Sequence, residues 1–248
     1  MSQSTFVKST LILSVATLLS KILGSIFRIP LQNIAGDEVL GIFSMVYPVY
    51  MVALILSVAG IPVAISKLIA EARAQNDRST IKHIYLTASI LALLFGLTSF
   101  TLIYSFSDQL AAALGGPSTK LALVIVAATL LIAPYMAVYR GYFQGFEDMK
   151  PTAVSQVLEQ LIRVGIILVM AYFLVVRDYS NEIVAGGVMV GSIAGALASL
   201  IYLRITYVKR KAKISGGEPY SWQIFWRWGK RILSVSIPIA IGAVTMAL

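Results

Sequence analysis

Cysteine is absent from the 248 residues and histidine occurs once. Without cysteine, a disulfide framework, a thiolate metal site and a nucleophilic thiol are all excluded. Charge is also scarce, since Asp, Glu, Lys and Arg make up 12% of the chain, whereas soluble domains carry roughly 25%. Hydrophobic residues make up 58%, and the mean hydropathy is +0.84. This composition predicts an integral membrane protein built from helices.

Seven apolar stretches follow one another along the chain. They lie at about Phe6–Phe27, Val39–Ser66, His83–Phe106, Leu121–Tyr139, Thr152–Val176, Ile183–Ile205 and Ile232–Leu248. The first six are long enough to cross a bilayer, which takes about 20 helical residues. We therefore expect an all-α, polytopic membrane bundle with six complete spans and the start of a seventh. Gly60 and Pro62 predict a kink or break late in the second span.

Basic residues are distributed unevenly between the connections. Counted from the sequence, fifteen lie at the N-terminus and in the loops after the even-numbered spans, whereas Arg28, Lys120 and Arg177 are the three on the other side. The positive-inside rule then predicts a multi-pass protein of the bacterial plasma membrane with a cytoplasmic N-terminus. The net charge of +9 is explained by this topology, because no nucleic-acid-binding motif accompanies it.

The spans and loops suggest a division of the chain. We expect a six-helix transmembrane lobe over residues 1–208, a cytoplasmic linker rich in basic residues and tryptophan over 209–231, and the first helix of a second lobe over 232–248. Many transporters consist of two related halves. The sequence, which is still apolar at Leu248, is therefore interpreted as one half and the beginning of the next.

A polar stripe follows one face of the first span. Its members are spaced three or four residues apart and fall within an arc of roughly 80°: Thr10, Ser14, Thr17, Lys21, Ser25 and Arg28. Lys21 stands 13 residues beyond Lys8, which at about 1.5 Å per residue places it about 20 Å deep. An isolated cation there costs about 3 kcal/mol, so a water-filled cavity or an anionic partner is expected.

The fifth span repeats this pattern with Gln156, Glu159, Gln160 and Arg163. Glu159 and Arg163 are four residues apart and are expected to form an ion pair. That spacing fits a structural pair as well as it fits a substrate ligand at Arg163. Two such stripes predict a shared hydrophilic interior for an anionic cargo, with Lys21 and Arg28 of the first stripe and these four residues as the candidate binding set.

Two further patterns predict packing rather than chemistry. Gly187, Gly191 and Gly195 form a double small-xxx-small repeat in the sixth span, typical of close helix contact. Tyr135, Tyr139 and Tyr142 are predicted to form an interfacial aromatic belt.

Several motifs resemble one family. The run Arg140–Gly145 (RGYFQG), the segments Met149–Ala153 and Ser155–Gln156, the run Glu159–Val164 (EQLIRV), and Gly60–Lys67 with Ser20–Gly24 carry the resemblance. Together they resemble the polysaccharide biosynthesis and stage V sporulation protein B-like branch, related to lipid II flippases, of the multidrug/oligosaccharidyl-lipid/polysaccharide (MOP) exporter superfamily. The resemblance covers the first six spans.

This resemblance implies fourteen helices in two lobes around a cavity that opens alternately to each side. It implies flipping of undecaprenyl-pyrophosphate-linked cell-wall precursors such as lipid II from the inner to the outer leaflet. Lys21 matches the first cavity-lining basic residue of the family directly, and Arg28 matches the next with a shift of one residue. Val52 stands where the resemblance implies a further basic residue.

Other functions fit the sequence less well. A cation-coupled multidrug antiporter of the same superfamily is the main alternative, but Glu159 is the only acid well inside a span. A membrane-embedded glycosyltransferase would need clustered acid/base or metal-binding groups, which are not evident, and a scaffold would leave the charged stripes unexplained. We expect no cofactor or metal, no nucleic-acid partner, and contacts with membrane lipids. An ATP-binding loop is missing, so an H+ or Na+ gradient or the membrane potential would supply the energy.

Overall fold

The computed structural model describes residues 3–58, 60–210 and 219–247. These residues fold into α-helices joined by short turns and two short 3-10 helices. The α-helices are α1 (Gln3–Ile26), α2 (Arg28–Val58), α3 (Ile61–Ala74), α4 (Arg78–Ser105), α5 (Ser107–Ala113), α6 (Lys120–Ala127), α7 (Ala133–Gly145), α8 (Lys150–Val176), α9 (Asn181–Arg210) and α10 (Trp222–Ala247). The 3-10 helices η1 (Pro117–Thr119) and η2 (Ala128–Leu131) precede and follow α6. The predicted all-α class is confirmed.

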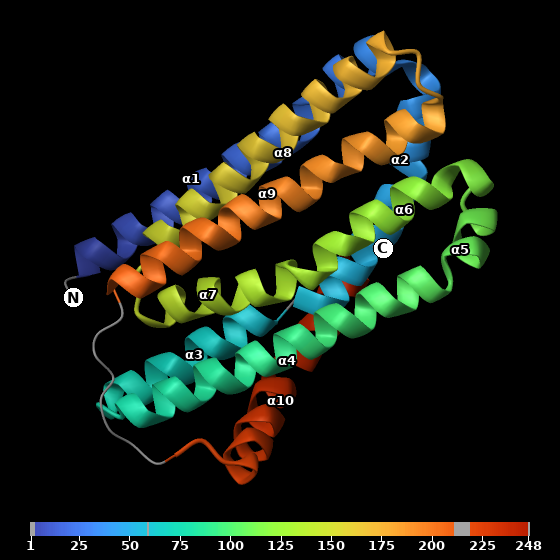
Figure 1. Ribbon diagram of the computed structural model, residues 1–248. Coiled ribbons are helices and arrows are strands. Elements are labelled where there is room, and N and C mark those ends of the chain that lie inside the picture. Colours follow the sequence, from blue (N-terminus) through green and yellow to red (C-terminus); the bar gives the residue numbers. More distant parts are fainter. Residues whose placement is uncertain (1–2, 59, 211–218, 248) are drawn as a thin grey trace.

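Five stretches of the described chain are long and apolar enough to cross a membrane. The first, Thr10–Ala74, has 65 residues, about three times the length of one crossing, and contains α1, α2 and α3. A break at Phe27 and a kink at Gly36 (φ 79°, ψ 178°) lie within it. The chain turns back there, so this stretch includes both the first and the second predicted spans (Figure 1). The other four stretches contain α4, η1 to α7, α8 and α9.

The predicted break in the second span is present. Helix α2 ends at Val58, α3 begins at Ile61, and Gly60 between them has a left-handed φ of 83°. A Cβ at Gly60 would lie 2.4 Å from the backbone oxygen of Ser236 in α10. Glycine is therefore required at this position both by the left-handed conformation and by the close approach of α10.

The helices form two groups that pack against each other. In Figure 1, α1, α8 and α9 run side by side in one group, while α3, α4 and α7 form the other, and α10 packs on its outer side. Helix α10 begins at Trp222, ten residues before the predicted start at Ile232, and includes all three tryptophans. Trp228 and Ile232 are buried against the second group, whereas Trp222 is 69% exposed.

Glycines bring α9 against α8, as the small-residue repeat predicts. A Cβ at Gly191 would lie 2.7 Å from the carbonyl oxygen of Arg163, and a Cβ at Gly195 would lie 2.5 Å from the carbonyl oxygen of Glu159. The backbones of the two helices thus touch behind the charged residues of α8. This contact fixes the position of the polar stripe of α8 in the bundle.

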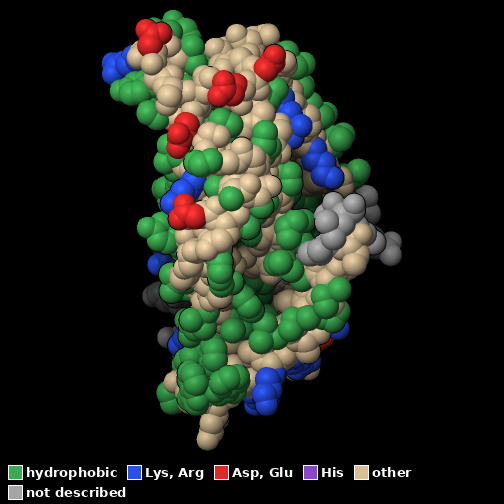
Figure 2. Space-filling view, turned by 90° about the vertical axis from the view of Figure 1, so that its right-hand side faces the viewer, with side chains coloured by type: hydrophobic (Ala, Val, Ile, Leu, Met, Phe, Trp, Pro, Cys, Tyr) green, Lys and Arg blue, Asp and Glu red, His purple; other side chains and the backbone are tan. Residues whose placement is uncertain are grey.

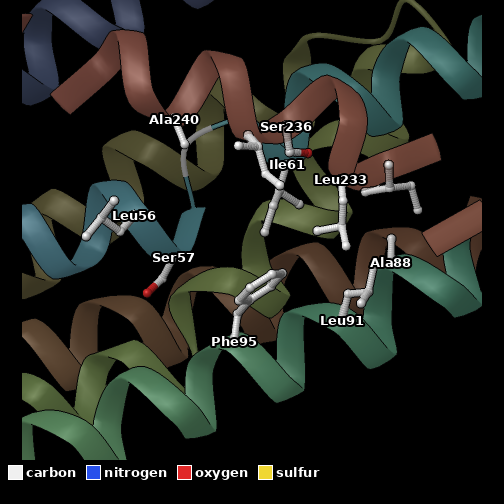
Figure 3. A pocket seen from close by; sticks show the side chains of 11 residues that line it. Leu56, Ser57, Ile61, Ala88, Leu91, Phe95, Leu233, Ser236 and Ala240 are labelled. Carbon is white, nitrogen blue, oxygen red and sulfur yellow. The ribbon is translucent and has the colours of Figure 1, made fainter. Parts of the chain in front are cut away.

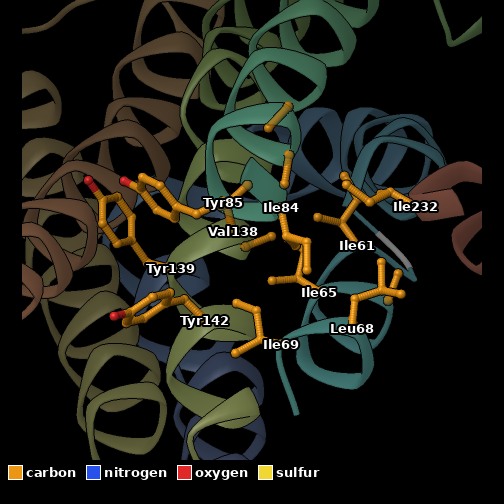
Figure 4. Packing of buried hydrophobic residues seen from close by; sticks show 14 of the residues in the cluster. Ile61, Ile65, Leu68, Ile69, Ile84, Tyr85, Val138, Tyr139, Tyr142 and Ile232 are labelled. Atoms are coloured by element: carbon orange, nitrogen blue, oxygen red, sulfur yellow. The ribbon is translucent and has the colours of Figure 1, made fainter. Parts of the chain in front are cut away.

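The tyrosines of α7 lie in the protein core. Tyr139 is fully buried, and its ring packs on those of Tyr85 and Tyr207 at centroid distances of 5.8 and 5.4 Å. Figure 4 shows the hydroxyl groups of Tyr85, Tyr139 and Tyr142 pointing away from the aliphatic residues of α3. The predicted interfacial belt is therefore wrong, because helix packing covers these rings and Arg204 donates a hydrogen bond of 2.9 Å to the Tyr139 hydroxyl.

The charged loops divide between the two ends of the bundle. The turns after α3 and α7 and the end of α9 lie at the end where α1 begins, while the α1–α2, α4–α6 and α8–α9 connections lie at the other (Figure 1). Ion pairs link the loops of the first end, among them Arg73 with Glu147 at 3.5 Å and Arg210 with Asp148. In the space-filling view, most visible acidic side chains lie in the upper half, and hydrophobic side chains reach the surface over the full height (Figure 2).

Gly195→Ala is expected to lower the thermal stability of the detergent-solubilised protein. The added methyl group overlaps the α8 backbone, and overpacking of this kind costs about 1–3 kcal/mol. Gly165→Ala is the matched control, because a Cβ at Gly165 meets nothing within 4 Å and alanine stabilises an open helical position by about 1 kcal/mol. Equal unfolding midpoints for the two variants would contradict the packing described here.

Candidate functional site: a polar cavity between α1 and α8

A polar cavity of about 420 Å³ opens between α1 and α8. Both predicted polar stripes contribute to it, and α2 adds one tyrosine. The lining residues are Thr17, Ser20, Lys21, Gly24, Ser25, Tyr47, Gln156, Glu159 and Gln160. Four of the six predicted site residues thus line one cavity.

The three α1 hydroxyl groups that line the cavity are already hydrogen-bonded. Those of Thr17, Ser20 and Ser25 donate to the carbonyl oxygens four residues earlier, at 2.8, 2.8 and 3.0 Å. The Thr17 hydroxyl also lies 3.1 Å from Oε1 of Gln156, which links α1 to α8. These residues make the cavity wall polar while leaving the backbone of α1 helical.

Lys21 is the cation of this wall. Its side chain is exposed to the cavity, and no acidic group in the described part of the chain forms an ion pair with it. The hydrocarbon interior makes an unneutralised ammonium group costly. An open polar cavity offsets that cost with water, and it leaves the charge available to a negatively charged ligand.

Gly24 allows the two helices to meet beside Lys21. A Cβ at this position would lie 2.3 Å from Nε2 of Gln160. The absence of a side chain lets the Gln160 amide extend across to α1. Its Oε1 accepts a hydrogen bond of 3.2 Å from Nη1 of Arg163.

Glu159 is held by two arginines. Its Oε1 lies 2.6 Å from Nη2 of Arg163, as the four-residue spacing predicts, and its Oε2 lies 2.8 Å from Nη2 of Arg140 in α7. The three side chains are 12–16% exposed. Two guanidinium charges already outweigh the single charge of Glu159, which disfavours the binding of a further cation there.

Arg140 is the residue that the sequence analysis missed. Counting charges assigned it to a cytoplasmic loop, whereas it lies inside α7 and reaches towards α8 and α9. Its Nε donates to Ser155 at 3.0 Å and its Nη2 to Ser199 at 3.2 Å. Its presence in the RGYFQG motif, beside the EQLIRV motif in the same resemblance, was the available signal.

Arg163 and Arg28 do not line the cavity. Arg163 lies behind Glu159, and its Nε is buried without a hydrogen-bond partner among the described residues. Arg28 is exposed at the start of α2, after the break at Phe27. The first stripe therefore ends with α1, because the helix does not continue to Arg28.

The three-residue network carries a net charge of +1, from two arginines and one glutamate. Together with Lys21 it makes the site positive. The described residues contain no group of three or more His, Asp or Glu side chains arranged to hold a metal ion. The geometry suits electrostatic binding of an anion rather than acid/base or metal chemistry.

Another cavity lies apart from this site. It occupies about 80 Å³ between α2, α3, α4 and α10 and is mostly apolar, with Leu56, Phe95 and Leu233 among its lining residues (Figure 3). None of its residues lines the Lys21 cavity. Its small volume and apolar lining are those of a gap between packed helices.

Solved transporter structures share this fold. The chain superposes on an outward-facing multidrug resistance MATE family transporter of the MOP superfamily with a TM-score of 0.79, covering 98% of this chain and 53% of that one at 18% identity. A MOP superfamily transporter from Pyrococcus furiosus gives a TM-score of 0.74, covering 97% and 53% at 17% identity. The fold is therefore that of MOP superfamily transporters.

The family follows from the sequence comparisons. A model of the polysaccharide biosynthesis protein family matches residues 6–244, so the chain belongs to this family. Stage V sporulation protein B of Bacillus subtilis (strain 168) is 35% identical over 212 residues, 85% of this chain and 40% of that protein. Lipid II flippase MurJ of the same organism is 30% identical over 227 residues, 87% and 42% respectively. The chain thus spans less than half the length of these two relatives.

Glu159→Gln is expected to destabilise the protein by about 3–5 kcal/mol, the cost of leaving buried charges unpaired. Thermal unfolding of the purified protein measures this loss. The triple variant Arg140→Gln, Glu159→Gln, Arg163→Gln removes every charge of the network and should recover part of it. Asp108→Asn is the control, because its pair with Lys120 is exposed and such pairs contribute about 0–1 kcal/mol. A Glu159→Gln variant as stable as Asp108→Asn would show that the network does not hold the helices.

Proposed function

We propose that this chain forms one lobe of a transporter that moves an undecaprenyl-pyrophosphate-linked cell-wall precursor from the inner to the outer leaflet of the bacterial plasma membrane. The observation that carries the proposal is Lys21, a cation without an ionic partner among the described residues, in a polar cavity within the apolar part of the bundle. The relationship to lipid II flippase MurJ supports the same cargo. Alternating access of two lobes provides the movement.

The cavity chemistry matches the head group of such a lipid. A pyrophosphate is an anion, and Lys21 supplies a point charge for it. The side-chain amides of Gln156 and Gln160 supply neutral donors and acceptors for sugar and peptide groups. The net positive network behind Glu159 adds to the potential that an anion meets in the cavity.

The tail of the lipid has a suitable environment on the other side of the same helix pair. There α1 and α8 form an apolar groove of about 610 Å³, lined by residues such as Leu11, Val15, Leu158 and Leu161. The α1–α8 pair therefore separates a charged side from an apolar side. This separation suits an amphiphile whose head group crosses through water while its tail stays in lipid.

In this proposal the roles of Arg140, Glu159 and Arg163 are structural. They join α7, α8 and α9 behind the cavity wall and hold Glu159 and its neighbouring glutamines in place. The structural role of the Glu159–Arg163 pair is thus favoured over direct binding of cargo by Arg163.

A cation-coupled multidrug antiporter is the second candidate, since the structural relatives include MATE transporters. An antiporter needs an acidic group that is free to bind Na+, H+ or a cationic drug. Glu159 is the acidic residue lining the cavity, and both of its oxygens contact arginines. This geometry favours the anionic cargo, with an H+ or Na+ gradient or the membrane potential as the proposed source of energy.

In vesicles that contain the full-length protein, Lys21→Ala is expected to slow the flipping of fluorescent lipid II at least about tenfold. The reason is the loss of one charge-assisted hydrogen bond to the cargo. Lys21→Arg should retain part of the rate. The control is Lys120→Ala, whose lysine lies outside the cavity in an exposed pair with Asp108. Unchanged flipping in Lys21→Ala would refute the role of this residue, and drug efflux without lipid flipping would favour the antiporter.

The topology is testable with single cysteines, because the chain has none. We propose a cytoplasmic N-terminus on the basis of the basic residues in the loops. Ser180→Cys and Ala113→Cys, at exposed positions of the connections opposite the N-terminal end, should react with an impermeant thiol reagent in intact cells. Gln75→Cys should react only after permeabilisation. The reverse labelling pattern would invert the proposed orientation.

A further inference from the structure

A second charged cavity lies at the end of the bundle where α1 begins. It occupies about 390 Å³ between α3, α4, α7 and α9, and it shares no lining residue with the Lys21 cavity. Three arginines stand around it, Arg73, Arg78 and Arg210. Each comes from a different part of the chain, since α3 supplies the first, α4 begins with the second and α9 ends with the third.

The arginines are held loosely. Arg73 pairs with Glu147 at 3.5 Å, and both side chains are more than 40% exposed. Arg210 pairs with Asp148, and Arg78 has no ion pair among the described residues. An exposed pair such as Arg73–Glu147 contributes about 0–1 kcal/mol, so Arg73 can turn to another anion at little cost. Three cations and two carboxylates leave an excess of one positive charge.

The floor of the cavity is aromatic. Phe146 lies under Arg73, whose Cζ is 5.7 Å from the ring centroid. Tyr142 also lines the cavity, and its hydroxyl has no hydrogen-bond partner among the described residues. Figure 4 shows that hydroxyl pointing away from the aliphatic core. The cavity thus combines a basic rim, a free hydroxyl donor and an apolar base.

We propose that this cavity binds the phosphate head group of an anionic membrane phospholipid. Basic pockets between transmembrane helices bind such head groups, and the guanidinium fork matches phosphate oxygens. The aromatic floor suits the glycerol and first methylene groups of a lipid, which a free phosphate ion lacks. The position at one end of the membrane-spanning helices, where head groups lie, also favours a lipid over a soluble anion.

Native mass spectrometry of the full-length protein in detergent tests this proposal. Dioleoyl phosphatidylglycerol and dioleoyl phosphatidylcholine are added in turn, so that the two probes differ only in the head group. We expect phosphatidylglycerol to bind more tightly. The variant Arg73→Gln, Arg78→Gln should weaken that binding about 30-fold, at about fivefold per arginine near the membrane surface.

Arg177→Gln is the matched control. Arg177 also stacks on a phenylalanine, with its Cζ 4.1 Å from the Phe173 ring centroid, but it lies between α8 and α9 at the opposite end. Its substitution should leave phosphatidylglycerol binding unchanged. Inorganic phosphate in large excess should not displace the lipid.

The outcomes that overturn the proposal are distinct. Equal binding of the two lipids, or equal binding by the double variant and the parent protein, would exclude a head-group site. Displacement by inorganic phosphate would assign the cavity to a soluble anion. If the double variant does not fold, Tyr142→Phe decides, because it keeps the ring packing and should weaken binding about tenfold by removing one hydroxyl donor. These results are independent of lipid II flipping.

Discussion

The carboxylate of Glu159 is the group on which the arrangement of the site depends. Each of its oxygens accepts a hydrogen bond from a different arginine, and one of these comes from a separate helix. A buried charge is costly unless it is paired and fully hydrogen-bonded, so the three side chains define the relative positions of α7 and α8 closely. The polar wall of α8 faces α1 because this network and the α9 glycines fix the helix from behind.

The same network leaves Lys21 as the exposed charge of the cavity. The carboxylate that could have neutralised Lys21 is already engaged by Arg140 and Arg163. The cavity therefore keeps the positive charge of Lys21. A fold shared with multidrug transporters does not fix the charge of a cavity by itself, and here the ionic partners of Glu159 determine it.

The sequence predicted the parts of the structure that follow from local pattern. Apolar length located the membrane helices, Gly60 and Pro62 located the break, and three- and four-residue spacing placed Lys21, Gln156, Glu159 and Gln160 on facing stripes. The first span was predicted to end at about Phe27, as it does, but the immediate start of α2 at Arg28 was missed, because Arg28 continues the three- and four-residue spacing of the α1 stripe. Arg140 was missed for a different reason, since its role depends on a contact between residues 19 positions apart in the chain.

The two basic sites differ in what their arginines and lysines are bound to. At the α1–α8 cavity the arginines are tied into the fold, and a single lysine remains for the ligand of the proposed transport. At the second cavity Arg73 sits in an exposed pair that exchanges partners easily, and Arg78 has no ion pair among the described residues, which suits the lipid of the further proposal. In the two proposals, strong internal pairing thus leaves one lysine for a transported anion, whereas weak pairing at the membrane boundary leaves arginines for a bound lipid.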